Sequence, residues 1–144
     1  MRNMSFALTT AQFNNRSKTV TRRLGWANLK PGEVFMGVEK GQGIPKGGKV
    51  KKLHTARCKS NRPEKLRRLT DDLDYGFAET AREGFPEGHP LHWPSEFVRF
   101  FCEHNGCTPE TVVNRIEFEH LTQDPFLPAP SAALSATAGK SCPQ

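Results

Sequence analysis

Three segments with the pattern of β-strands follow one another in the first half of the chain, with only short connections between them. The segments "KTVTRRL" (18–24) and "VFMGVEK" (34–40) are rich in β-branched and apolar residues. The third, "KVKKLHTARC" (49–58), alternates between two sets of side chains, as a strand with one wet face does. The turn "LKPGE" (29–33) has proline and glycine where a β-turn prefers them. These features predict a largely antiparallel sheet.

Helical patterns flank these strands. A short helix is predicted in "LTTAQFNNRS" (8–17), and a helix or broken pair of helices begins at Thr70 and ends at Gly84. The segment "PSEFVRFFCEHNG" (94–106) predicts a further helix with an apolar stripe, and "TVVNRIEFEHL" (111–121) alternates as a final strand. We assign this stripe to the core: Phe97, Phe100, Phe101 and His104. The order of elements predicts an α+β fold, a small, mostly antiparallel β-barrel with flanking helices.

A change of composition divides the chain into two parts. Residues 5–121 hold the patterned segments and are predicted to form one domain, whereas residues 122–144 are rich in Pro, Ala and Ser and predict a disordered tail. No apolar run approaches the ~20 residues of a membrane span, and no signal peptide is visible after either possible start, Met1 or Met4. We expect a cytoplasmic monomer with four free cysteines: Cys58, Cys102, Cys107 and Cys142.

Charge is strongly segregated along the chain. Residues 1–69 carry 17 Lys and Arg against 3 Asp and Glu, while residues 70–124 carry 3 against 12. The segment Lys46–Arg68 alone holds ten cations and one carboxylate, that of Glu64. Such separation favours a basic face directed at a polyanion or an anionic ligand. The alternative is that the two halves face each other across the fold.

The segments "SKTVTRRLGW…LKPGE", "AREGF…PSEFVRFF" and "VNRIEFEHL" together resemble an ASCH domain, a member of the PUA-like β-barrel superfamily. The resemblance covers about residues 5–121. It implies a PUA-like barrel that binds or acts on RNA or nucleosides, as in phage and bacterial proteins of this family. One branch of the family hydrolyses the amide of N4-acetylcytidine. By that resemblance the catalytic residues are Lys18, Thr21 and Glu83, and the arginine of the motif is Arg23.

The residue types suit this chemistry. A threonine hydroxyl needs a base, and a lysine whose pKa is lowered by burial or by nearby cations can act as one. Glu83 can relay a proton to the leaving amine or hold the lysine, while an arginine can bind a carbonyl oxygen, an oxyanion or a phosphate. The neighbouring residues predicted to bind the ligand are Thr19, Arg22, Arg23 and Trp26.

Two features of this segment set conditions on the site. In a regular strand Lys18 and Thr21 point to opposite faces, so they converge only if Lys18 lies outside the strand. The small residue that the family has two places before the lysine is Arg16 here, and Asn15 is the alternative for an unusual backbone conformation. A purely structural reading of the segment is an edge strand protected by its cations.

Three functions remain open at this stage. The first is a module that binds RNA, a nucleoside or a nucleotide in a basic pocket, with nucleic-acid contacts from Lys49, Lys51, Lys52, Arg57 and Lys59. The second is an amidohydrolase acting on N4-acylated cytidine, and the third is a regulatory phage protein that docks another protein through its acidic half. We expect no cofactor and no metal, because Cys102, His104 and Cys107 lack a second ligand pair.

Overall fold

The structure is a computed structural model that describes residues 1–40 and 48–121, and the predicted tail therefore lies outside the described residues. No helix in these two ranges is long and apolar enough to span a bilayer. The elements in chain order are β1 (Asn3–Ser5), α1 (Thr10–Asn14), β2 (Val20–Arg23), β3 (Val34–Val38), β4 (Lys52–Lys65), α2 (Arg68–Asp71), α3 (Leu73–Arg82), the 3₁₀ helix η1 (Pro90–His92), α4 (Pro94–Asn105) and β5 (Val112–His120).

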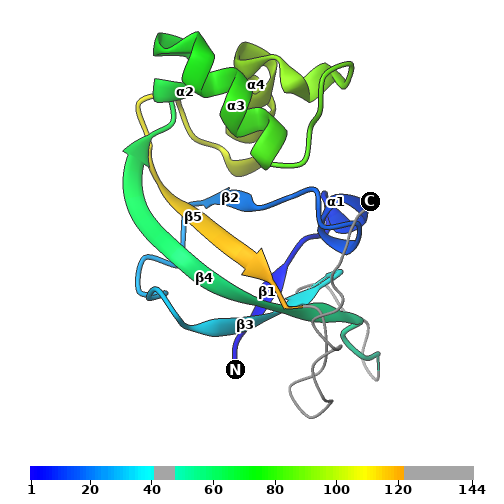
Figure 1. The fold of residues 1–144 in the computed structure, drawn as a ribbon. Helices are drawn as coiled ribbons and strands as arrows, with labels where there is room; N and C mark the ends of the chain where they lie inside the picture. The colour runs from blue at the N-terminus through cyan, green and yellow to red at the C-terminus, as the bar shows by residue number, and fades with distance from the viewer. Residues whose placement is uncertain (41–47, 122–144) are drawn as a thin grey trace, which may run out of the picture.

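The five strands form one open sheet in the order β1-β3-β4-β5-β2. β1 and β3 are parallel, and all other neighbours are antiparallel. In Figure 1 the long strands β4 and β5 run side by side from the lower part of the molecule up to the helices. The edge strands β1 and β2 do not pair with each other, so the predicted closed, mostly antiparallel barrel is wrong, whereas the α+β class is confirmed.

The sheet stays open because its edge strands are short. β1 has three residues and β2 has four, so neither strand offers the other a full ladder of hydrogen bonds. A side chain crosses between them instead: the Arg23 guanidinium on β2 donates a hydrogen bond to the carbonyl of Ser5 on β1. The sequence pattern missed β1 because three residues are too few to show a period.

β4 is longer than the strand predicted from residues 49–58. It continues through "SNRPEK" because this segment pairs with β5, after a bulge between Cys58 and Ser60. Even Pro63 lies in the ladder, opposite Asn114. The extended pair carries the chain from the sheet core into the helical part of the molecule.

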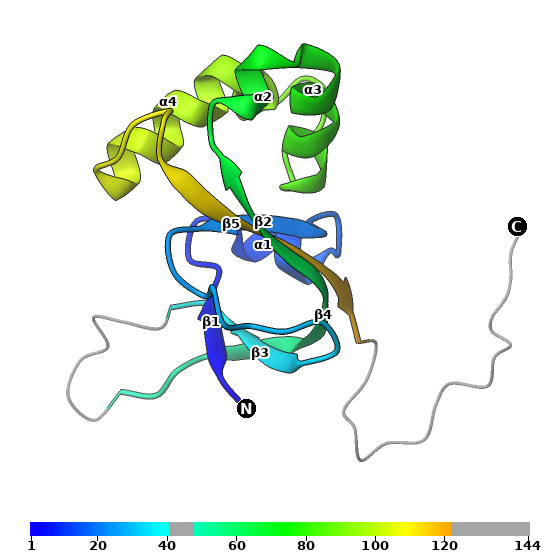
Figure 2. The same ribbon diagram turned by 90° about the vertical axis from the view of Figure 1, so that its left-hand side faces the viewer.

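Two hydrophobic clusters support the fold. The first lies on the sheet and includes Phe6, Phe13 of α1, Phe35 and Phe118. The second joins the helices to the far ends of β4 and β5 and includes Leu69, Phe97, Phe101 and Val113. Figure 2 shows α2, α3 and α4 gathered on one side of the strands. The predicted helix that begins at Pro94 is confirmed, and it ends in the left-handed Gly106.

Candidate functional site

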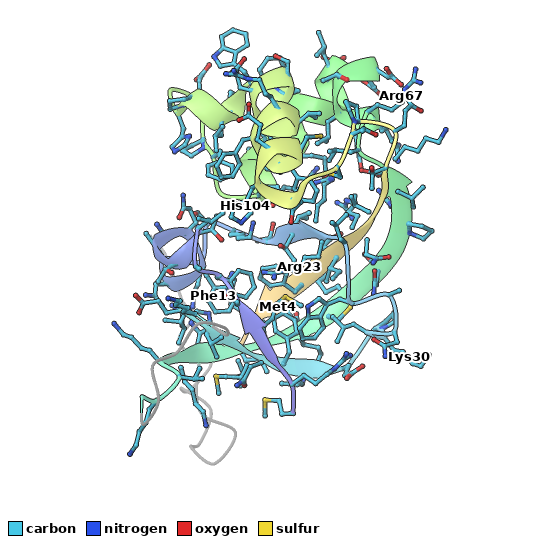
Figure 3. All side chains as sticks on the ribbon, turned by 180° about the vertical axis from the view of Figure 1, so that it is seen from behind. Met4, Phe13, Arg23, Lys30, Arg67 and His104 are labelled. Carbon is cyan, nitrogen blue, oxygen red and sulfur yellow. The ribbon has the colours of Figure 1, made fainter. Side chains whose placement is uncertain are left out.

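A pocket of about 390 Å³ lies where β2, the chain before α1 and helix α4 meet. In Figure 3 Arg23 of β2 lies between His104, on α4, and Met4, in the sheet core. One wall is polar and comes from β2 and the end of α3. The opposite wall is apolar and comes mainly from α4. The residues used below that line the pocket are Lys18, Thr21, Arg22, Arg23, Trp26, Glu83, Phe85, Phe97, Phe100, Phe101 and His104.

Lys18 and Glu83 form a buried ion pair although 65 residues separate them. The Lys18 ammonium donates to Glu83 Oε1 at 2.7 Å and to the Glu83 carbonyl at 2.9 Å. Their side chains are only 3% and 4% exposed. The backbone N–H of Thr19 also donates to the carbonyl of Arg82, which fixes the start of β2 to the end of α3. The structure thus brings two of the three residues implied by the ASCH resemblance into direct contact.

Gly84 permits this close approach. Its φ of +106° is a conformation that favours glycine, and a Cβ on it would lie 2.7 Å from Gln12 Cβ. The same Cβ would lie 3.4 Å from Lys18 Cβ. A side chain at position 84 would therefore push the end of α3 away from the segment that carries Lys18.

Thr21 lines the same pocket and is 4% exposed. β2 begins at Val20, so Lys18 lies before the strand and is free of the alternation that would direct it away from Thr21. The Lys18 N–H donates to the carbonyl of Gln12, in α1, at 3.2 Å. Lys18 therefore lies at the junction of helix and strand, which is the arrangement needed for Lys18 and Thr21 to face one pocket.

The electrostatics of Lys18 favour a neutral amine more than in water. Burial lowers the pKa of Lys18, and the charge of Glu83 opposes this effect without cancelling it. The cations Arg23 and Arg22 lower the pKa further. A lysine in this state can accept a proton, as a general base requires.

Arg22 is among the residues that line the pocket, but its side chain is fully buried. Its guanidinium binds carboxylates and does not face the open space of the pocket. Its guanidinium donates to Glu83 Oε2 at 3.2 Å, to Glu79 Oε1 at 2.6 Å and to Glu64 Oε2 at 2.8 Å. Burial alone would lower the pKa of Arg22, but Glu83 and the other two carboxylates raise it above its ordinary value. Arg22 and Lys18 thus each bind one oxygen of the Glu83 carboxylate and fix its orientation.

A second arginine extends this network into the sheet. Arg115, on β5, donates to both carboxylate oxygens of Glu79, at 2.6 and 3.0 Å. Burial would raise the pKa of Glu79, but Arg115 and Arg22 hold it down at about 2. The Tyr75 hydroxyl donates to Glu64 at 2.6 Å. Sequence reasoning missed Glu64, Glu79 and Arg115, because only the pairing of β2 with β5 and the docking of α3 bring them together.

The other predicted ligand-binding residues differ in position. Arg23 lines the pocket and lies over the Phe6 ring, with its Cζ 4.9 Å from the ring centroid. Trp26 also lines the pocket, and the guanidinium of Arg2 lies over its ring, with Arg2 Cζ 4.5 Å from the ring centroid. Thr19 is not among the pocket-lining residues. The Thr19 N–H donates a hydrogen bond to the carbonyl of Arg82, and the Thr19 carbonyl accepts one from the N–H of Phe118.

The aromatic wall of the pocket was assigned to the core from the sequence. Phe97 and Phe101 do belong to the second hydrophobic cluster, but they also line the pocket. Phe100 stacks on His104 with a ring separation of 6.0 Å and an interplanar angle of 8°. The sequence signal was the helical stripe itself, which does not tell a core face from a pocket wall.

The five cations predicted to contact nucleic acid lie away from the pocket, and several are paired. Lys51 pairs with Glu39, Arg57 with Glu119 and Lys59 with Glu117. None of the five lines the pocket: Lys49, Lys51, Lys52, Arg57 and Lys59. Exposed ion pairs between β4 and β5 account for part of the charge segregation seen in the sequence. No cluster of three or more potential metal-ligating side chains exists in residues 1–40 and 48–121.

The backbone just before β2 takes the unusual conformation that was considered above for Arg16 and Asn15. Arg16 itself has a φ of +68°, and Asn15 supports the turn by accepting a hydrogen bond from the N–H of Ser17 at 2.9 Å. The conformation is thus adopted by Arg16 and not by Asn15, which has a φ of −85°.

A histidine pair holds Lys18 from the other side. His120 Nε2 lies 2.6 Å from the Lys18 carbonyl, which can only accept, so this nitrogen carries the proton. His120 Nδ1 is then the acceptor for His54 Nε2, 2.7 Å away. Burial lowers the pKa of both rings, that of His54 to about 4, so both are neutral near pH 7. Sequence reasoning did not single out this pair.

Comparison with known proteins does not assign the chain to a family. No family model matches it, and no curated protein matches its sequence. Among solved structures it is similar to protein EF3133 from Enterococcus faecalis V583, of the DUF984 family, with 16% identity and a TM-score of 0.48. The match covers 81% of this chain and 74% of that chain. This similarity carries no conclusion about function.

Proposed function

We propose that the pocket binds an N-acylated nucleoside of the N4-acetylcytidine type and hydrolyses its amide bond. The observation that supports this proposal most directly is the buried Lys18–Glu83 pair in the same pocket as Thr21. A buried lysine with a lowered pKa that shares a pocket with a hydroxyl provides the two groups that an activated nucleophile needs. The resemblance of the surrounding segments to ASCH amidohydrolases supports the same three residues.

In the proposed reaction, Lys18 first passes a proton to Glu83 across their hydrogen bond, and the neutral amine then accepts the hydroxyl proton of Thr21 while Thr21 Oγ1 attacks the amide carbon. The C–N bond breaks as the leaving nitrogen takes up that proton, either from Lys18 or through Glu83. This leaves an acyl ester on Thr21 and a free amine. Water then attacks the ester, releases the carboxylic acid and restores the hydroxyl.

The dimensions and the lining of the pocket support a small ligand over a nucleic-acid strand. A volume of about 390 Å³ is within the usual range for small-molecule sites, which are mostly apolar with a few polar groups. The aromatic wall formed by Phe97, Phe100 and Phe101 offers surfaces on which a base can stack. Ion pairs on Arg57 and Lys59 reduce the charge available to track phosphates.

The test is the release of acetate from N4-acetylcytidine by the purified protein. We expect Lys18→Ala, Thr21→Ala and Glu83→Gln each to reduce kcat/KM, the first two by roughly 10³-fold or more, since residues of one catalytic unit fail together. Thr19→Ala is the matched control, because Thr19 lies two residues from Thr21 but does not line the pocket, and it should retain activity.

Two results would reject the enzyme. One is an absence of turnover in the wild-type protein, and the other is a Thr21→Ala variant that keeps its rate. If turnover is absent but a short RNA binds with an affinity that falls steeply as salt rises, the nucleic-acid-binding module would be supported instead.

A further inference from the structure

Arg23 has a cationic group whose polar partners are incomplete. Its Nε is the one buried side-chain nitrogen or oxygen in the described ranges that lacks a hydrogen-bond partner. The guanidinium bonds the Ser5 carbonyl and lies over the Phe6 ring, but it forms no ion pair with a described carboxylate. Arg23 as a whole is half-buried, but a buried donor without a partner is costly, so the free Nε requires an explanation.

The buried cations of residues 1–40 and 48–121 all have carboxylate partners. Lys18 pairs with Glu83, and Arg22 pairs with Glu83, Glu79 and Glu64. Arg115 pairs with Glu79 through two hydrogen bonds. Arg23 differs from them: it lines the pocket two residues from the proposed nucleophile and forms no ion pair with a described carboxylate.

The charges around the pocket also favour an anion. Of the arginine and lysine side chains that line it, Lys18 and Arg22 are bonded to carboxylates, which leaves Arg23 as the lining cation without an ion pair to a described carboxylate. Both oxygens of Glu83 already accept hydrogen bonds from Lys18 and Arg22, so Glu83 forms no direct ion pair with Arg23, although its charge partly opposes the effect of burial on the Arg23 pKa. Burial lowers the pKa of Arg23 to about 10, which still leaves the group charged at neutral pH.

From this unpaired guanidinium we infer that the ligand carries an anionic oxygen group, phosphate or carboxylate, that binds Arg23. The inference rests on the proposed function for the identity of the rest of the ligand. The guanidinium is suited to such groups, because its fork of donors matches the geometry of carboxylate and phosphate oxygens. A phosphate would belong to a nucleotide, and a carboxylate would belong to the acyl chain.

The experiment compares three amides that differ in the position of a negative charge: N4-acetylcytidine, its 5′-monophosphate, and N4-succinylcytidine with a free carboxylate on the acyl chain. We expect one of the two anionic compounds to exceed the neutral one by at least tenfold in kcat/KM at low salt. Preference for the monophosphate identifies a phosphate at Arg23, and preference for the succinyl compound identifies a carboxylate.

Variants of Arg23 then assign the preference. Arg23→Gln should remove it, and Arg23→Lys, which keeps the charge but loses the fork, should retain part of it. Arg57→Gln is the matched control, because it removes an exposed arginine that does not line the pocket, and it should keep the preference. If Arg23→Gln does not fold, as thermal unfolding would show, the wild-type comparison and Arg23→Lys still decide the question.

Equal kcat/KM for the three wild-type reactions would overturn the inference and leave the proposed function intact. The inference would also be overturned if Arg23→Lys lowered kcat/KM equally for all three amides, because the arginine would then act on the amide carbonyl that they share. If no amide is hydrolysed, binding of cytidine 5′-monophosphate and cytidine is compared by calorimetry. A preference for the monophosphate that Arg23→Lys weakens would support the anion site and reject the enzyme, and no binding of either would overturn both.

Discussion

At the scale of single residues, the candidate site depends on backbone conformations that few residue types adopt. Arg16 and Gly84 both have positive φ values, and they lie in the two segments whose contact joins Lys18 to Glu83. Gly84 is the more demanding position, because it combines a glycine conformation with a contact that leaves no space for a Cβ. A single Cβ added at position 84 would therefore disturb the contact between the two segments that carry Lys18 and Glu83.

Gly84→Ala should destabilise the protein more than Gly88→Ala does. Both glycines have similar positive φ values, +106° and +97°, so both substitutions incur the strain of a left-handed backbone, roughly 1–2 kcal/mol. Only the Cβ at position 84 meets another atom within 4 Å, namely Gln12 Cβ at 2.7 Å. Urea unfolding of both variants measures the difference, and equal losses would show that the contact relaxes at no cost.

At the scale of elements, the pairing of β4 with β5 places two histidines where they hold the chain at Lys18. His54 stacks on Phe13 of α1 with a ring separation of 4.2 Å, and His120 bonds the Lys18 carbonyl. One end of this strand pair therefore supports α1 and the segment that carries Lys18. Its other end, through Leu66 and Val113, supports the helices.

Stability should fall as the pH decreases from about 6.5 to 4. The pKa of His54 is lowered to about 4 in the folded protein from an ordinary 6.5, chiefly by burial and by the nearby charge of Arg16. In this window the unfolded chain binds more protons than the folded one, so lower pH favours unfolding. The lowered pKa values of Glu64 and Glu79 act mainly below their ordinary value of 4.5, outside most of this window.

His54→Gln tests this assignment, because an amide can still donate to His120 but does not titrate. The variant should show a smaller decrease in unfolding midpoint between pH 6.5 and 4.5 than the wild-type protein. His104→Gln, on the exposed end of α4, is the matched control and should leave the decrease unchanged. A His54→Gln protein with the wild-type pH dependence would show that this ring does not control it.

At the scale of the whole molecule, a buried network of charges joins the helical part to the sheet. Glu79 of α3 is fully buried and bonds Arg22 of β2 and Arg115 of β5. Cations from the first half of the chain thus meet carboxylates from the second half inside the fold, as they do on its surface at Arg57 and Glu119. Much of the segregation in the sequence is therefore resolved by contacts within the molecule.

Glu79→Gln should cost about 3–5 kcal/mol of unfolding free energy, because it leaves two buried guanidinium groups without their shared counter-charge. Glu110→Gln is the matched control: Glu110 is exposed, its ion pairs are with Lys65 and Arg67, and its loss should cost at most about 1 kcal/mol. Denaturant unfolding at low and high salt measures both. Similar losses for the two variants would mean that the buried network contributes no more than a surface pair.

The sequence by itself determined the features that depend on neighbouring residues. Its patterns predicted the strand at 18–24, the helix from Pro94 to its end before Gly106, and the final strand, because periodicity and caps are local properties. The resemblance of short motifs also selected Lys18 and Glu83, which the structure places in contact. Their catalytic roles remain predictions.

Only the tertiary structure decided which distant groups meet. The open sheet, the pairing of Arg22 with three carboxylates and the unpaired Arg23 all depend on how β1, β2 and β5 are arranged. Neighbouring arginines are equivalent in sequence, yet alternation along β2 turns one toward carboxylates of the interior and the other toward the pocket. Contacts between distant segments follow from burial and strand pairing over the whole chain, so no local pattern contains them.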